Sequence, residues 1–412
     1  MLKKLKSLYV ISLIYYKQHG FIELIKKIRG YMMSPKKISK IDIVEHYSFI
    51  TRENFGVNWQ DGMASENTIN WVIPNFSVGS GGHLNIFRFI SFLEKDGYKV
   101  NIVIDEVDCG QDTVKLAEII CKNFVRLKAN VFFGLENAPV AYSIFATSWT
   151  TAYTVKAYRS VKRKFYFVQD FEPMFYASSS EHSFAENTYK FGFTGITAGK
   201  WLSDKLSNEY RMECNYVGFS YDKDRYIPAI YERTKKIKRI FFYARPPTPR
   251  RALELGILAL QKLANERNDI EVVFAGWDLT PYNFDFPYES HGVVGLDALP
   301  KLYTTCDVAL VLSFTNLSLL PLELMASGVP VVSNRGPNVE WLLNDQVCQF
   351  SSSDTDSIAS SIIELIDDDN KRTSLRAAGI KFAGETSWDN EGLRFIQIYN
   401  SYLKGERIEL HL

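Results

Sequence analysis

Short unbroken apolar runs recur along the chain, and stretches with apolar residues three or four positions apart lie between them. Unbroken apolar runs joined through helices are typical of parallel strands that are covered on both faces of a sheet. The pattern therefore predicts an α/β fold in which strands and helices alternate. Strands are predicted at residues 68–76, 99–105, 130–133, 142–146, 165–168, 191–196, 239–243, 271–275, 292–294, 308–312 and 329–332. Helices are predicted at residues 84–95, 113–123, 200–209, 322–327, 355–367 and 386–404.

The alternation pauses at residues 217–228 and then resumes, so it falls into two sets. A chain of 412 residues is long enough for two or three domains with separate cores. The sequence therefore predicts two doubly wound, Rossmann-like domains. The predicted parts are a leader and extension at 1–65, a first domain at 66–220, a linker at 221–236, a second domain at 237–385 and a terminal helix at 386–412.

The first forty residues are strongly basic although the whole chain is nearly neutral. They carry ten Lys and Arg residues against one acid, a net +9 in a chain whose total is +1. Residues 2–31 have roughly helical apolar spacing, which fits either a basic helix on an anionic membrane surface or a solvated helix packed on its own domain. The longest apolar stretch, residues 8–16, is about half the length that crosses a bilayer, and no cleavage site follows it. A transmembrane span and a signal peptide are not expected.

Cysteine and histidine usage narrows the class of protein further. The five cysteines are scattered without a Cys-x-x-Cys pair, which favours reduced thiols in a cytoplasmic protein. The six histidines do not cluster, and no zinc-binding spacing is present. Nucleic acid is not the expected partner, because the chain has neither a strong positive charge nor a zinc-finger or ribonucleoprotein motif.

The stretch at residues 299–334 carries the most specific pattern in the chain. One carboxylate, Glu323, begins a short helix between two buried strands, near the edge where open α/β sheets bind ligands. A helix N-terminal acid that complements the helix dipole is the alternative interpretation. The run Met-Ala-Ser-Gly-Val-Pro-Val-Val that follows resembles the donor-binding signature of the family-4 glycosyltransferases, which have the GT-B fold. In that family two acids, eight positions apart, precede this run; Glu323 matches the second, and Thr315 stands in place of the first.

A glycine-rich turn and an arginine-rich loop follow two of the predicted strands. Gly79, Gly81 and Gly82 precede a helix whose first amides could meet an anion, although a plain strand-to-helix turn would use the same residues. Arg245 ends a strand, and Arg250 and Arg251 open a helix, where two positive charges oppose the dipole unless a diphosphate binds there. The family resemblance implies phosphate contacts for Arg245 and Arg250, with Arg251 a close rival.

Two carboxylates leave the strand at residues 165–168 among aromatic side chains. Asp170 could orient or deprotonate an acceptor hydroxyl, and Glu172 could do so instead. A structural role for Asp170 as the cap of the next turn is the other interpretation. Many family-4 enzymes have His-Asp at this loop, and this chain has Gln169 in the histidine position.

The resemblance implies further donor contacts. Glu323 would accept hydrogen bonds from the nucleotide ribose, while Thr315 would alter or lose a contact with the donor sugar. The remaining implied donor-site residues, at phosphate or base, are Gly276, Gly295, Lys301, Tyr303, Ser318 and Leu319. A solvated lysine on a helix is the equal alternative for Lys301.

The sequence is thus interpreted as a retaining GT-B glycosyltransferase that needs no metal or other cofactor. The first domain would bind the acceptor, the second the nucleotide-sugar, and the terminal helix would cross back to the first. The run Phe-Val-Gln-Asp-Phe-Glu-Pro-Met-Phe-Tyr also resembles bacterial rhamnosyltransferases of cell-surface or S-layer glycan assembly, which implies dTDP-β-L-rhamnose as donor. The acceptor would be a glycan, lipid-linked if the basic leader holds the enzyme on the cytoplasmic face of the membrane. The alternatives are a UDP-sugar 2-epimerase-like isomerase and a non-catalytic nucleotide-sugar sensor.

Overall fold

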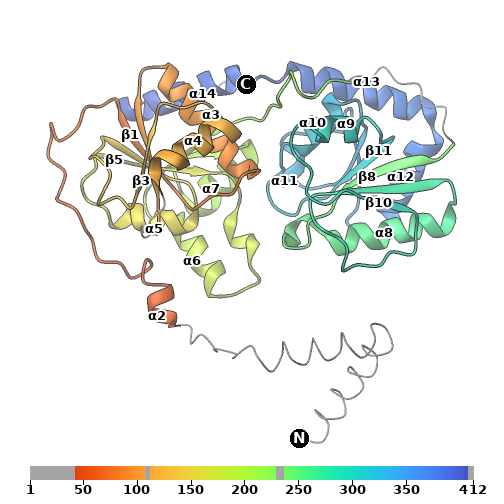
Figure 1. The fold of residues 1–412 in the computed structure, drawn as a ribbon, viewed down its shortest axis with the longest axis horizontal. Coiled ribbons are helices and arrows are strands. Elements are labelled where there is room, and N and C mark those ends of the chain that lie inside the picture. Colours follow the sequence, from red (N-terminus) through yellow and green to blue (C-terminus); the bar gives the residue numbers. More distant parts are fainter. Residues whose placement is uncertain (1–41, 107–111, 229–235, 407–412) are drawn as a thin grey trace, which may run out of the picture. The chain divides into compact units, whose positions relative to one another are not determined.

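The computed structural model describes residues 42–106, 112–228 and 236–406 (Figure 1). The chain divides into two units, Met1–Ser48 and Phe49–Leu412. In the first unit the described helix is α2 (Ile43–His46), which Asp42 caps by accepting hydrogen bonds from two backbone amides. The amphipathic helix predicted at residues 2–31 lies outside the described part of the chain. Within that part, no helix is both long enough and apolar enough to cross a membrane.

The first sheet of the larger unit is parallel throughout, with the strand order β3-β2-β1-β4-β5-β6-β7 among the described residues. Its strands are β1 (Thr68–Ile73), β2 (Lys99–Ile104), β3 (Asn130–Phe133), β4 (Ser143–Ala146), β5 (Arg163–Val168), β6 (Thr194–Ala198) and β7 (Cys214–Val217). The helices between them are α3 (Gly81–Lys95), α4 (Thr113–Asn123), α5 (Trp149–Ala157), the 3-10 turn η1 (Glu172–Phe175), α6 (Ser180–Thr188) and α7 (Lys200–Tyr210).

The second sheet is also parallel, with the order β10-β9-β8-β11-β12-β13 among the described residues. Its strands are β8 (Lys238–Tyr243), β9 (Ile270–Ala275), β10 (Tyr288–Ser290), β11 (Val308–Val311), β12 (Val331–Asn334) and β13 (Cys348–Ser351). Its helical elements are η2 (Pro249–Arg251), α8 (Leu253–Glu266), α9 (Leu299–Tyr303), α10 (Leu320–Ala326), α11 (Pro337–Glu340), α12 (Thr355–Asp367) and α13 (Asp369–Glu385). The chain continues into α14 (Trp388–Lys404).

Both sheets are covered by helices on their two faces, as their unbroken apolar strands require (Figure 1). In β1, Trp71 packs with α3 on one face while its neighbour Val72 packs with α5 and α7 on the other. The last helix, α14, belongs to the first sheet: Phe395 and Tyr399 pack beside Trp71 in the same cluster.

Each sheet has one point where the strand order reverses: between β1 and β4 in the first, and between β8 and β11 in the second. Ligands of open α/β sheets bind outside the carboxyl ends of the strands at such points. The loops after β1, β4, β8 and β11 are therefore the places where a ligand is expected, and the loop after β5 follows the strand next to β4.

Some element boundaries differ from the predictions. The short strand predicted at residues 292–294 is wrong; β10 lies at Tyr288–Ser290 instead, because Tyr288 packs on Phe274 while Val293 is exposed. The strand predicted from residue 191 begins at Thr194, because Phe191 packs against Tyr153 of α5. β7 and β13 were not predicted.

Candidate functional site

The loop after β5 reaches residues that follow β8 and β11 of the second sheet. Asp170 is 9% exposed, and its carboxylate accepts hydrogen bonds from the backbone amide of Asn316 at 2.8 Å and from the Thr315 hydroxyl at 2.9 Å. It also accepts from the Phe171 amide at 2.8 Å, and the Nε of Arg250 lies 3.2 Å from its second oxygen. Asp170 thus joins the carboxyl edge of the first sheet to that of the second.

Side-chain hydrogen bonds hold the loop after β11 in the conformation in which its donors meet Asp170. The Asn338 side chain donates to the carbonyls of Ser313 and Thr315, at 2.9 and 2.6 Å. The Asn316 side chain donates to the carbonyls of Gln169 and Ala198, at 2.9 and 2.6 Å. These bonds use the side-chain amide of Asn316. The backbone amide of Asn316 and the hydroxyl of Thr315 are the donors that meet the oxyanion.

The three arginines after β8 have different environments. Arg245 is exposed. Arg250 is partly buried and stacks over the Phe175 ring at 4.0 Å. Arg251 donates to the Ser313 hydroxyl and to the Asn316 carbonyl, and burial lowers the pKa of its guanidinium to about 10, so it remains charged near neutral pH. Arg251 therefore supports the β11 loop, which leaves Arg245 and Arg250 as the groups best placed for a ligand.

The glycine-rich turn lies beside the Asp170 loop. Gly79 has φ +91°, and a Cβ on Gly82 would lie 3.5 Å from the Gln169 side chain. Ser80, the residue before α3, makes no side-chain cap; its hydroxyl lies 2.8 Å from Nδ1 of His83 instead. Burial lowers the pKa of His83, which favours the neutral ring. The first amides of α3 are therefore open to an anion.

Glu172 faces into its own domain. Its carboxylate accepts hydrogen bonds from the Trp149 amide, at the start of α5, and from the Tyr166 hydroxyl, at 2.6 and 2.7 Å. Burial raises the pKa of Glu172 to about 7, although these two donors and Arg250 oppose the shift. The geometry gives Glu172 the role of a positioning residue that shapes the loop carrying Asp170.

The raised pKa of Glu172 predicts a loss of stability with rising pH. Its usual pKa of 4.5 applies to the unfolded chain, so between about pH 4.5 and 7 the folded state binds more protons than the unfolded state. The stability from this group is therefore complete below pH 4.5 and falls as pH rises through 7. We expect Glu172→Gln to reduce this loss by about 1–3 kcal/mol, measured as the free energy of unfolding in urea at pH 5 and pH 8. An identical pH dependence in the variant and the unchanged chain would contradict this.

Glu323 lies in the first turn of α10 among groups from several elements. Burial raises its pKa to about 7, and the Tyr226 hydroxyl and the guanidinium groups of Arg88 and Arg225 oppose the shift while Asp222 adds to it. Tyr303 is 1% exposed and lies between the Tyr226 and Phe241 rings, with centroids at 6.0 and 4.9 Å. Tyr303 therefore shapes the surroundings of Glu323, and its ring is covered.

The remaining predicted donor-site residues surround this edge of the second sheet. Gly276 has φ +114°, and a Cβ there would lie 2.8 Å from the Tyr243 ring, so glycine is required. Gly295 has open surroundings, and Lys301 is exposed on α9. Ser318 and Leu319 are partly buried directly before α10.

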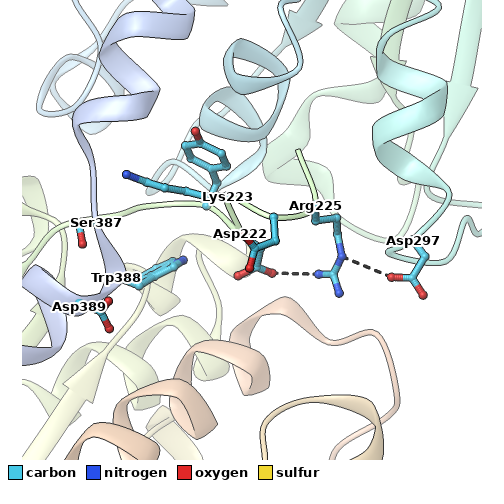
Figure 2. A pocket seen from close by; sticks show the side chains of 9 residues that line it. Asp222, Lys223, Arg225, Asp297, Ser387, Trp388 and Asp389 are labelled. Carbon is cyan, nitrogen blue, oxygen red and sulfur yellow. Dashed lines mark hydrogen bonds and ion pairs between the residues drawn. The ribbon is translucent and has the colours of Figure 1, made fainter. Parts of the chain in front are cut away.

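Residues of the linker between the sheets line a pocket of about 850 Å³ (Figure 2). Arg225 lies between two carboxylates, 2.9 Å from Asp222 and 3.4 Å from Asp297. Asp222 also binds Arg88 of α3 at 2.9 Å, and Arg88 stacks over Trp388 of α14 at 4.1 Å. Through Arg88, Asp222 thus connects the linker with α3 and α14.

Sequence reasoning missed three residues that the structure places at the site: Arg88, Tyr226 and Asn316. Arg88 is a cation within the apolar run Phe87-Arg88-Phe89 of a helix, a departure from amphipathic spacing that could have marked it. Asn316 belongs to the polar stretch after β11, in which the sequence pattern singled out only Thr315.

Two doubly wound parallel sheets, a linker, and a last helix that packs on the first sheet define the GT-B fold, which confirms the predicted fold class. The structure of Anabaena Alr3699/HepE in complex with UDP and glucose superposes with a TM-score of 0.63 at 12% identity, over 81% of this chain and 99% of that one. This likeness concerns the fold.

Sequence comparisons point to surface-glycan proteins. Residues 238–363 match the family model described as the C-terminal domain of WsaF. The O-antigen biosynthesis protein RfbC of Myxococcus xanthus is 31% identical over 336 residues, which are 79% of this chain and 26% of that protein. The O-antigen chain mannosyltransferase B of Escherichia coli is 31% identical over 109 residues, 26% of this chain and 29% of that protein. The chain thus spans little more than a quarter of the length of these two relatives.

Proposed function

We propose that this chain is a glycosyltransferase of bacterial surface-glycan synthesis, which moves a sugar from a nucleotide-sugar to a glycan acceptor. The observation that carries the proposal is the contact of Asp170 with Arg250, Thr315 and Asn316. It brings a carboxylate suited to an acceptor hydroxyl within reach of guanidinium and amide donors suited to a diphosphate. The similarity to two O-antigen proteins supports the same class of substrate.

In the reaction, arginines that follow β8 of the second sheet would stabilise the negative charge of the leaving group. As the bond between the sugar and the diphosphate breaks, Arg245 and Arg250 would stabilise the negative charge on the departing phosphate. The acceptor oxygen, oriented by Asp170, would bond to the sugar carbon on the same face, which retains the configuration. Its proton would pass to the departing phosphate oxygen.

The preferred donor is dTDP-β-L-rhamnose, on the resemblance of the residues around Asp170 to rhamnosyltransferases. Glu323, with a pKa raised to about 7, would face the ribose hydroxyls. Thr315 stands where the related signature has an acid, and its hydroxyl donates to Asp170. The acid's contact with the donor sugar would therefore be lost, which suits a sugar with fewer hydroxyls to bind.

A thermal-shift panel of dTDP, UDP, GDP and ADP, each free and as the sugar conjugate, tests this proposal. We expect one diphosphate and its sugar conjugate to raise the melting temperature, and that conjugate to release its diphosphate when a glycan acceptor is added. Sugar isomerisation without transfer would identify an isomerase, and binding without any turnover would identify a sensor. No shift with any nucleotide would reject the proposal.

A further inference from the structure

Three donors from the second-sheet side converge on one carboxylate of the first-sheet side. They are the Thr315 hydroxyl, the Asn316 amide and the Nε of Arg250. A guanidinium, an amide and a hydroxyl around one anion are the donor types that bind phosphate oxygens. The Asp170 carboxylate occupies the centre of this set.

The fit of Asp170 to this set is incomplete at Arg250. The Nε of Arg250 is buried and makes no aligned hydrogen bond within the described residues, although Asp170 lies 3.2 Å away. The contact is therefore a charge contact, and the N–H retains a hydrogen bond to give. The guanidinium is held in place separately by the Phe175 ring, at 4.0 Å.

We propose that Arg250, Thr315 and Asn316 form an oxyanion site that Asp170 fills in the free chain and that the diphosphate of the donor takes over. A diphosphate carries more charge than one carboxylate and can align with the unused Nε–H. The proposal rests on the proposed function, because it assigns the donor diphosphate to this set.

The exchange has a consequence for the acceptor. A carboxylate has about four lone-pair positions, and hydrogen bonds from Phe171, Asn316 and Thr315 fill three of those of Asp170. The Arg250 guanidinium lies against the second oxygen in a charge contact. Once the diphosphate takes over these donors, the second oxygen of Asp170, which Thr315 and Arg250 cover in the free chain, becomes open to an acceptor hydroxyl. Donor binding would thus prepare Asp170 for the acceptor.

If the Asp170 carboxylate and the diphosphate compete for the same donors, removing the charge of Asp170 should tighten nucleotide binding. Loss of a direct contact with the ligand would weaken binding instead. We expect Asp170→Asn to bind the preferred diphosphate of dTDP, UDP, GDP and ADP about 3- to 30-fold more tightly in calorimetry, a change that reaches only the lower end of measured charge-pair couplings. Asp61→Asn is the matched control for charge: Asp61 pairs with Lys162, just before β5, at the strand end opposite Asp170. Its affinity should equal that of the unchanged chain.

Asp170→Ser, with a smaller side chain, serves as a second variant, and a cooperative thermal transition confirms that each variant is folded. Equal or weaker binding by either folded variant would overturn the competition, as would equal tightening in Asp61→Asn. If the unchanged chain binds none of the four diphosphates, the proposed function fails and this inference fails with it. If the unchanged chain binds and neither variant binds more tightly, only this inference fails.

Discussion

Asp170→Asn is expected to lower the rate of sugar transfer by about 10²-fold, the loss that a small misplacement of a reacting group can cause. The asparagine can keep hydrogen bonds with the neighbouring amides but cannot act as a negatively charged acceptor for the hydroxyl of the incoming glycan. The measurement is diphosphate release at saturating donor and acceptor. Since the same change is expected to tighten nucleotide binding, the variant should be a better binder and a much slower catalyst.

Glu172→Gln is the matched control for this prediction. Glu172 lies two positions from Asp170, but its carboxylate binds Trp149 and Tyr166 within the first-sheet side. We expect transfer by this variant to fall far less than in Asp170→Asn. Transfer by Asp170→Asn within about threefold of the unchanged chain would remove Asp170 from the reaction and make its role one of holding the two sides together.

Arg245→Ala is expected to weaken diphosphate binding by about 10- to 100-fold. Arg245 is exposed after β8, at the reversal of strand order, and a charge-assisted bond to phosphate contributes about 1.5–3 kcal/mol. Isothermal titration with the preferred diphosphate measures the loss, and raising the salt concentration should reduce the affinity of the unchanged chain as well.

Lys301→Ala is the control for Arg245→Ala, because Lys301 is an exposed cation on α9 of the same sheet. We expect its affinity to change by less than about threefold, as for a solvated lysine. Unchanged binding in Arg245→Ala together with a large loss in Lys301→Ala would place the phosphates beside α9 and not beside the loop after β8.

The sequence predicted the long elements well where apolar periodicity and capping agree. The helices at Thr113–Asn123 and Thr355–Asp367 begin and end as predicted, each after an aspartate that caps the first turn. β7 and β13, four residues each, were missed because such runs are too short to show a period. β10 was misplaced because the apolar pair Val293-Val294 resembles a strand, while the aromatic contacts that define β10 involve residues distant in sequence.

The candidate site was predictable in parts but not as a whole. Strand-end positions marked Asp170, Arg245 and Glu323, because parallel strands bring their carboxyl ends to one edge. The contact between Asp170 and Asn316 spans 146 positions, and no local pattern contains it. Arg250 and Arg251 differ in role because Arg251 donates to Ser313 and Asn316 of the β11 loop. Two adjacent identical residues do not reveal this difference in the sequence.

A crystal structure of the full chain with its preferred nucleoside diphosphate tests the central claim most directly, namely that the strand ends after β8 and β11 form one nucleotide site. We expect the diphosphate on Arg245 and Arg250, the ribose against Glu323, and Asp170 separated from Arg250. A nucleotide bound elsewhere, or one that touches Glu323 while Asp170 and Arg250 remain in contact, would contradict it.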